Sequence, residues 1–149
     1  MLYFAYGSNL WRNQMHDRCP DHEEIGYGIL QGYRWLISQR GYATIVASPR
    51  DEVHGKVYML TEPDECSLDR YEGVYEGGYR KEIVPVILDG HSTPCLVYID
   101  PVETEGVAWP EYVGRINRGI SDSALCPEYV ARYMRKFIPV TGCDALCGV

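Results

Sequence analysis

The chain lacks any long apolar run. None of its hydrophobic stretches approaches the roughly 18 residues that a membrane-spanning helix requires, so no membrane partner is expected. It also lacks the basic start and apolar core of a signal peptide, because Met1 leads directly into an apparent strand with polar Ser8 and Asn9 close behind. We therefore expect a cytoplasmic protein.

Positively charged residues are also few. The 149 residues include 14 Lys and Arg against 21 Asp and Glu, a net charge of -7, and no cluster of Lys or Arg stands out. Proteins that bind nucleic acid usually present a basic face, so no nucleic-acid partner is expected. With 46% hydrophobic residues, the composition favours one domain over residues 1–149 with a substantial core.

The short motifs of metal, nucleotide and serine-hydrolase sites are also missing. No pair of histidines or cysteines has zinc-binding spacing; the histidines are His16, His22, His54 and His91. There is no G-x-S-x-G nucleophile elbow and no G-x-x-x-x-G-K-S/T phosphate loop. The pair Gly26 and Gly28 is too sparse for a dinucleotide-binding fingerprint. We expect neither a metal nor a cofactor.

The cysteines have no pattern of a disulfide framework in a protein expected to be cytosolic. They are Cys19, Cys66, Cys95, Cys126, Cys143 and Cys147. We expect them to be reduced and mostly buried. Cys143 and Cys147 lie four residues apart with no histidine nearby, which favours two free thiols over a metal site.

Phenylalanine is scarce and tyrosine is abundant, with 2 Phe against 13 Tyr. Tyrosine combines an apolar body with a tip that forms hydrogen bonds. Such an excess suits a cavity with a polar lining, and half-buried strand positions are the alternative explanation.

The order of elements predicts an α+β protein. Alternating and β-branched stretches predict strands at 2–6, 25–38, 43–47, 53–60, 78–88 and 94–100, with a turn at 48–51. Apolar residues at helical spacing predict helices at 10–18, 62–71, 111–119 and 127–137, with a loop at 101–110. Because the strands follow one another through short turns, we expect a small mixed β-barrel with flanking α-helices.

The start of the chain carries the first candidate site. Leu2–Tyr6 has the pattern of a strand that ends in Gly7, Ser8 and Asn9 before a helix. Glycine tolerates backbone conformations that other residues avoid, and Ser and Asn are good helix N-caps. Free N–H groups at a helix start attract an anion such as a carboxylate. By itself, this pattern is also that of an ordinary strand–turn–helix joint.

Glu72 is the candidate acid–base residue. It ends the expected helix immediately before Gly73, and Leu68 lies one turn earlier on the same face. A carboxylate beside an apolar residue and near tyrosines would have a raised pKa, which suits a general base near neutral pH. A helix C-terminus disfavours negative charge, so an acid at this position points to function. An ordinary solvated glutamate is the alternative.

Several segments, in the same order, resemble the γ-glutamylcyclotransferase family. They are Leu2–Leu10, Ala43–Val46 with Ser48-Pro49, Asp51–Val57, and Ser67–Val74 followed by Gly78-Tyr79. A weaker similarity covers 112–119 and 125–129. The resemblance implies a small mixed β-barrel with a cavity at one end.

The resemblance also implies a reaction and its residues. The α-amine of a γ-glutamyl amide or γ-glutamyl amino acid attacks its own γ-carbonyl, which gives 5-oxoproline and releases the amine without a metal or cofactor. The family's catalytic glutamate corresponds to Glu72, which would act as general acid and base. The substrate-binding positions that the resemblance implies are Tyr6, Gly7, Ser8, Asn9, Tyr79, Tyr98 and Tyr112, the last two by a weaker match.

Two alternatives stay open. The same pocket would suit a γ-glutamylamine, such as a crosslink fragment or a biosynthetic intermediate. A small-molecule binding module without catalysis is the other alternative, although Glu72 argues against it because a binder of a carboxylate ligand gains nothing from an acid there. The chain is expected to be a monomer or a homodimer.

Charged residues near the expected site allow two further predictions. The loop that precedes residue 111 is acidic, and its acids would favour a basic or polar leaving amine unless they are simply solvated; they are Asp100, Glu103, Glu105 and Glu111. Arg18 either reaches the pocket or pairs with Asp17 or Glu23, and we expect the pair.

Overall fold

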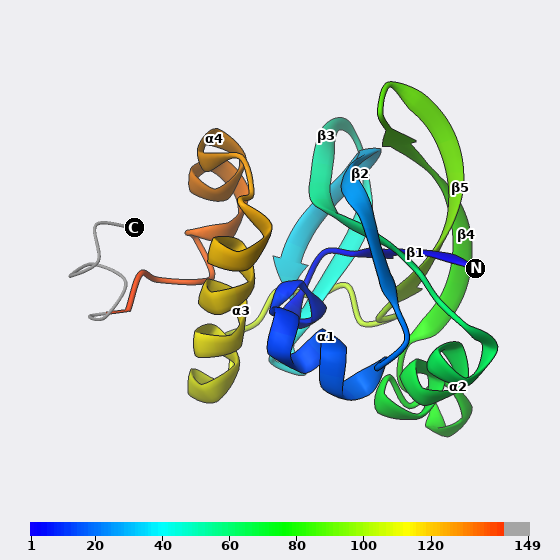
Figure 1. The fold of residues 1–149 in the computed structure, drawn as a ribbon. Helices are drawn as coiled ribbons and strands as arrows, with labels where there is room; N and C mark the ends of the chain where they lie inside the picture. The colour runs from blue at the N-terminus through cyan, green and yellow to red at the C-terminus, as the bar shows by residue number, and fades with distance from the viewer. Residues whose placement is uncertain (142–149) are drawn as a thin grey trace.

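The computed structural model describes residues 1–141. Within this part of the chain, the strands close into a barrel in the order β1-β3-β2-β4-β5 (Figure 1). The strands are β1 (Leu2–Ala5), β2 (Glu23–Ile37), β3 (Ala43–Met59), β4 (Arg80–Leu88) and β5 (His91–Ile99). β1 runs parallel to β5, and the other neighbours are antiparallel. The expected α+β fold, a small mixed β-barrel with flanking α-helices, is confirmed.

A pair of facing glycines makes room for Phe4 of β1 inside the barrel. Gly28 and Gly55 pair across β2 and β3. A Cβ atom on either glycine would lie 3.0 Å from Cε1 of Phe4, and one on Gly55 would also collide with the carbonyl oxygen of Ala5. Because neither glycine has a side chain, Phe4 lies over both, and β1 delivers the residues that follow it to the end of the barrel.

The prediction of two strands separated by a turn at 48–51 is wrong, because β3 is continuous through these residues. The pairing of β3 with β2 shifts its register between Gln31 and Tyr33. Residues 48–51 therefore form a bulge opposite Gly32. Pro49 lacks the N–H that a β-ladder requires, which is why the local sequence resembles a turn although the strand resumes after it.

The helices flank the barrel, and most lie near their expected positions. They are α1 (Arg12–Arg18), α2 (Glu62–Tyr71), α3 (Pro110–Ser123) and α4 (Pro127–Tyr129), with short helical turns η1 (Ser8–Leu10), η2 (Val74–Glu76) and η3 (Val130–Met134). The bounds predicted for α2 are confirmed. The Thr61 side chain accepts a hydrogen bond from the N–H of Asp64 over 3.2 Å, and Gly73 ends the helix in the left-handed conformation at φ 62°.

The last expected helix differs most from its prediction. The apolar spacing predicts one α-helix over 127–137, whereas α4 is short and continues as the π-helical turn η3. The N–H of Arg135 bonds to the carbonyl of Val130, five residues back, over 3.0 Å. Apolar spacing does not distinguish this wider turn from an α-helix.

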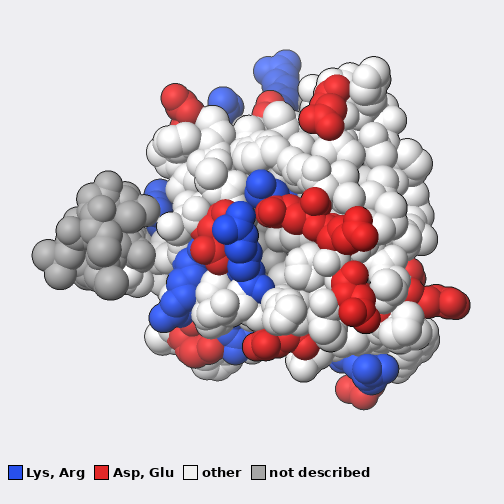
Figure 2. Space-filling model, viewed as in Figure 1, with Lys and Arg blue, Asp and Glu red and all other residues white. Residues whose placement is uncertain are grey.

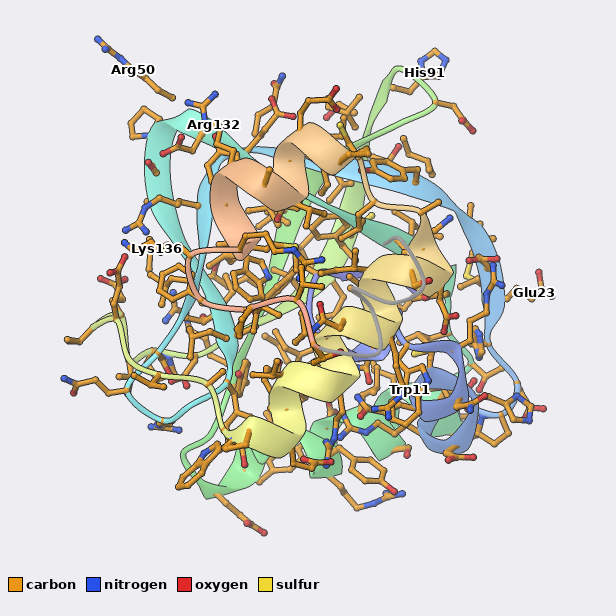
Figure 3. The ribbon with its side chains drawn as sticks, turned by 90° about the vertical axis from the view of Figure 1, so that its left-hand side faces the viewer. Trp11, Glu23, Arg50, His91, Arg132 and Lys136 are labelled. Atoms are coloured by element: carbon orange, nitrogen blue, oxygen red, sulfur yellow. The ribbon has the colours of Figure 1, made fainter. Side chains whose placement is uncertain are left out.

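The longest helix, α3, lies beside η1 and so next to the turn that follows β1. It crosses the side of the barrel with α4 above it (Figure 3). No helix in residues 1–141 is both long and apolar enough to span a membrane. Of the described cysteines, Cys19 and Cys95 are buried and Cys66 is exposed, and all are free; the predictions for Cys143 and Cys147 lie outside the described residues.

Candidate active site

One cavity of about 330 Å³ opens where the turn after β1, the end of α2 and the start of α3 meet. All the site residues that the sequence predicts line it, and they are Tyr6, Gly7, Ser8, Asn9, Glu72, Tyr79, Tyr98 and Tyr112. Residues that are more than 60 positions apart in the chain are therefore brought to one place.

The turn after β1 is fixed by hydrogen bonds from the side chains of Trp35 and Gln14. The indole N–H of Trp35 donates to the carbonyl of Tyr6 over 2.9 Å. The Gln14 side-chain amide donates to Ser8 Oγ over 2.7 Å and to Asn9 Oδ1 over 2.9 Å. A Cβ atom on Gly7 would lie 3.3 Å from the Tyr112 hydroxyl, so glycine leaves room between this turn and α3.

The expectation that Ser8 or Asn9 caps a helix is wrong. Gly7 is the cap residue of η1, Ser8 and Asn9 lie within η1, and no side chain caps it. The N–H groups of Ser8 and Asn9 nevertheless open a helical turn, and the first N–H groups of a helix have no partner within that helix. This stretch of backbone lies at the cavity wall.

Glu72 lies at the C-terminal end of α2, where its N–H donates to the carbonyl of Leu68 over 2.8 Å. Burial raises the pKa of the Glu72 carboxyl to about 7, and the positive charge of Arg18 opposes this rise. At neutral pH the group therefore exists in both forms, so it can accept a proton or donate one. It is the only carboxylate among the described residues that line the cavity.

Tyr79 and Tyr112 hold one wall of the cavity from either side of Ala43. The hydroxyl of Tyr79 donates to the carbonyl of Ala43 over 2.6 Å, and the hydroxyl of Tyr112 accepts from the N–H of Ala43 over 3.2 Å. Burial raises the pKa of both hydroxyls, that of Tyr112 to about 12, so both stay neutral at physiological pH.

Tyr98 lines the cavity but directs its hydroxyl elsewhere. That hydroxyl donates to Oδ1 of the buried Asp69 over 2.8 Å, and Asp69 pairs with Lys81 at 3.1 Å. The carbonyl of Tyr98 accepts a hydrogen bond of 2.5 Å from the hydroxyl of Tyr6. Tyr98 therefore links the cavity wall to an ion pair behind it.

Several lining residues were not predicted to belong to the site. They are Tyr3, Arg40, Tyr42, Tyr71 and Arg115, besides the glycines beside Glu72 and Tyr79. The abundance of tyrosine signals such a cavity, but it does not identify which tyrosines line it. Figure 2 shows Lys and Arg side chains gathered where α1 approaches α3, although the chain as a whole is acidic.

The expected ion pair of Arg18 is not formed within residues 1–141. Arg18 lines the cavity, donates to Asn9 Oδ1 over 3.2 Å and lies 4.5 Å from the centre of the Tyr71 ring. Its guanidinium therefore contributes positive charge beside Glu72, which is the alternative that the sequence left open.

The acidic loop does not face the cavity as a lid. All four acids lie within the described residues, and none of them lines the cavity. Asp100 is buried and accepts from the N–H of Val102 over 2.9 Å, whereas Glu105 pairs with Arg34 at 2.9 Å and with Lys136 at 3.1 Å. The suggested preference for a basic leaving amine therefore loses its structural basis. No group of three or more His, Cys, Asp or Glu that could hold a metal occurs among residues 1–141.

Comparison with known proteins identifies the family. The family model described as "Gamma-glutamyl cyclotransferase, AIG2-like" matches residues 3–112. A γ-glutamylcyclotransferase of Mus musculus is 34% identical over 142 residues, which cover 86% of this chain and 74% of that protein. The Homo sapiens γ-glutamylcyclotransferase is 32% identical over 139 residues, with the same coverage.

Solved structures agree with this match. One named "Gamma-glutamyl cyclotransferase" superposes with a TM-score of 0.81 at 31% identity and covers 89% of this chain and 85% of its own. An uncharacterized Homo sapiens protein superposes with a TM-score of 0.80 at 32% identity, covering 88% and 84%. The chain belongs to the AIG2-like γ-glutamyl cyclotransferase family.

Proposed function

We propose that this protein is a γ-glutamylcyclotransferase that converts a γ-glutamyl amide or γ-glutamyl amino acid into 5-oxoproline and releases the amine. One observation carries the proposal: Glu72 is the lone carboxylate among the described residues of the cavity, and burial raises its pKa to about 7. A group that ionises near the working pH is suited to take up a proton and return it within one reaction cycle.

The reaction removes two protons from the attacking nitrogen and protonates the leaving nitrogen, and a single carboxyl group can relay these protons. The Glu72 carboxylate removes a proton from the substrate α-ammonium, and the freed nitrogen attacks the γ-carbonyl carbon as the carbonyl electron pair moves onto oxygen. When the carbonyl reforms, the bond from that carbon to the leaving nitrogen breaks. Protonated Glu72 donates its proton to that nitrogen. The attacking nitrogen becomes positively charged when it forms the new bond, and it loses its second proton to the freed Glu72 carboxylate, which passes it to the released amine. The ring nitrogen thus ends as N–H, the amine leaves as an ammonium ion, and no water, oxidant or cofactor is consumed.

The remaining task of the site is to hold the substrate in a ring-closing shape. Placing two reacting groups of one molecule in contact accounts for a large share of the rate gain in such reactions. The substrate α-carboxylate would lie at the N–H groups of Ser8 and Asn9, with the Arg18 guanidinium adding positive charge. Tyr79 and Tyr112, through their bonds to Ala43, keep the adjoining wall fixed.

The test is release of 5-oxoproline, followed by mass spectrometry, from a panel of γ-glutamyl amides. Glu72→Gln keeps the size of the side chain but removes its acid–base function, so we expect turnover to fall by about 100-fold or more. Glu76→Gln is the matched control, because Glu76 is an exposed acid on η2 that does not line the cavity. It should retain the rate of the unmodified protein.

Two results would contradict the proposal. If Glu72→Gln retains full turnover, Glu72 is not the acid–base group. If no substrate yields 5-oxoproline, while 5-oxoproline or a γ-glutamyl amide still raises the melting temperature, the protein is a binding module. A ligand that raises the melting temperature without being converted distinguishes this outcome from a misfolded preparation.

A further inference from the structure

The cavity carries more positive charge than the reaction at Glu72 requires. Arginines Arg18, Arg40 and Arg115 line it, with one carboxylate, in a chain whose net charge is -7. Arg18 is bound to Asn9 and lies against the Tyr71 ring, beside Glu72, so it belongs to the end of the cavity where the glutamyl group reacts. Arg40 and Arg115 have no role in the proposed reaction.

The guanidinium of Arg40 makes only long contacts with the protein. Both of its terminal nitrogens lie 3.5 Å from the carbonyl oxygen of Gly77, and its Nε lies 3.6 Å from Oδ1 of Asp100. These distances are at the outer limit for hydrogen bonds. The side chain is 40% exposed, so its guanidinium is accessible to a ligand at the mouth of the cavity.

Arg115 reaches the cavity from α3 and is likewise only partly engaged. Its Nε donates to Glu111 over 2.7 Å, and one terminal nitrogen donates to Gln14 over 3.3 Å. The Glu111 side chain is 70% exposed, and ion pairs so open to water contribute little. These bonds use only part of the fork of N–H donors that a guanidinium carries.

The two arginines lie close in the chain to a pair of tyrosines that line the cavity. The rings of Tyr42 and Tyr112 meet edge to face, with centroids 5.1 Å apart. Arg40 precedes Tyr42 by two residues, and Arg115 follows Tyr112 by one helical turn. The cations therefore come from different elements, the β2–β3 connection and α3, and both face the same cavity.

We propose that Arg40 and Arg115 make this site selective for acidic leaving groups, so that γ-glutamyl conjugates of an acidic amino acid react in preference to those of a neutral or basic one. This inference rests on the proposed function. A guanidinium matches a carboxylate through paired N–H donors, and an acidic amino acid offers an α-carboxylate and a side-chain carboxylate to the two cations. A lysine side chain in the same place would be repelled.

The test compares three substrates of similar length: γ-glutamyl-glutamate, γ-glutamyl-glutamine and γ-glutamyl-lysine. The first two have nearly the same shape and differ by one charge. We expect kcat/KM for 5-oxoproline release to be about tenfold higher for the glutamate conjugate than for the glutamine conjugate, and lowest for the lysine conjugate. This comparison needs no variant and so does not depend on a variant's folding.

Variants then assign the preference to the arginines. Arg40→Gln and Arg115→Gln should each lower the ratio of the glutamate to the glutamine rate severalfold, and the double variant should bring it near unity. The matched control is Arg50→Gln, because Arg50 points away from the barrel on the β3 bulge (Figure 3). Raising the salt concentration from about 0.05 M to about 0.5 M should also lower the ratio, because salt screens exposed charges.

The outcomes separate the inference from the function on which it rests. If 5-oxoproline is released but the glutamine or lysine conjugate reacts as fast as the glutamate conjugate, the selectivity is refuted and the cyclotransferase function stands. If the preference survives in the double variant, the arginines are not its source and the inference is wrong. If none of the three conjugates yields 5-oxoproline, this inference is wrong, and the proposed function fails as well if the panel of γ-glutamyl amides also yields none.

Discussion

The N–H of Tyr79 donates a hydrogen bond to the carbonyl of Glu72 over 3.0 Å. This bond closes the loop that begins at Gly73, and the Tyr79 hydroxyl then ties the loop to the carbonyl of Ala43 over 2.6 Å. The backbone around Glu72 is thus fixed from α2 on one side and β3 on the other. Among the described residues no ion pair engages its carboxylate, which leaves that group available to a substrate.

The pH dependence of the reaction should follow the ionisation of Glu72. Burial raises the pKa of this carboxyl to about 7, and the carboxylate form is the one that accepts the substrate's proton. We expect kcat/KM to fall about tenfold for each pH unit below about 7. A rate profile from pH 5 to 9 measures this acidic limb.

Arg18→Gln tests whether the fall of kcat/KM at low pH comes from Glu72. Arg18 lowers the pKa of Glu72, so its loss should shift the limb to higher pH. The pKa of the substrate amine in solution is the same for every variant, and Arg50→Gln should leave the limb in place. An unchanged limb in Arg18→Gln would assign the ionisation to another group.

Glu72→Gln should also change stability, with a sign set by the same pKa. The folded protein holds this pKa at about 7, above its ordinary 4.5, and so favours the neutral acid. That contribution to stability is fully present below the ordinary pKa and is lost as the pH rises through 7. Glutamine stays neutral, so the variant should match the unmodified protein near pH 4 and exceed it at pH 8 by on the order of 1–3 kcal/mol.

Calorimetric melting at both pH values measures this difference, which corresponds to a rise of a few degrees at pH 8. Glu76→Gln, at an exposed position, should show no such gap between the two pH values. A Glu72→Gln variant that is less stable at pH 8 than the unmodified protein would mean that the carboxylate is stabilised by a partner.

Much of this fold can be predicted from local sequence, because the residues within and beside most helices and strands determine where those elements begin and end. The helix at 62–71 could be predicted to the residue, since Thr61 caps it and Gly73 ends it. The same local logic makes Glu72 a candidate, as an acid at the end of a helix that disfavours negative charge, whereas its catalytic role is a prediction from the family resemblance. The bulge at 48–51 could not be predicted in this way, because pairing with β2 decides whether the chain turns there or continues as a strand.

The cationic part of the cavity could not be predicted for a related reason. Arg40 lies outside the segments that resemble the family, and Arg115 lies in a segment with only a weak similarity, so neither is marked as a site residue. They share a cavity because the barrel closes and α3 packs beside η1, which are contacts between distant parts of the chain. The acids in and beside the loop at 101–110, on which the first prediction of a leaving-group preference rested, do not line this cavity.

Gly55→Ala should destabilise the barrel strongly. A Cβ atom at this position collides with the carbonyl of Ala5, and a backbone atom inside a paired strand cannot move aside as a side chain does. We expect a loss on the order of 3 kcal/mol in the free energy of unfolding, measured by denaturant titration. Gly114→Ala is the control of opposite sign: its Cβ meets only the side chain of Arg118, and alanine favours the helix by about 1 kcal/mol.

Tyr98→Phe should reduce stability more than activity. The lost hydroxyl donates to Asp69 over 2.8 Å and is directed to that buried acid, so its removal weakens the link between the cavity wall and the ion pair with Lys81. A hydrogen bond to a charged group contributes about 1.5–3 kcal/mol, which denaturant titration resolves. We expect 5-oxoproline release to fall by less than about tenfold, below the usual contribution of a placed acid or base.

Tyr79→Phe provides the matched comparison, because the Tyr79 hydroxyl holds Ala43 in the cavity wall beside the turn after β1. Losing that bond lets the wall move, so kcat/KM should fall further than in Tyr98→Phe. The two variants thus distinguish Tyr79, whose hydroxyl fixes the cavity wall, from Tyr98, whose hydroxyl stabilises the fold through Asp69. If Tyr98→Phe instead raises KM for the γ-glutamyl substrate while the free energy of unfolding is unchanged, Tyr98 contacts the substrate directly and its bond to Asp69 is incidental.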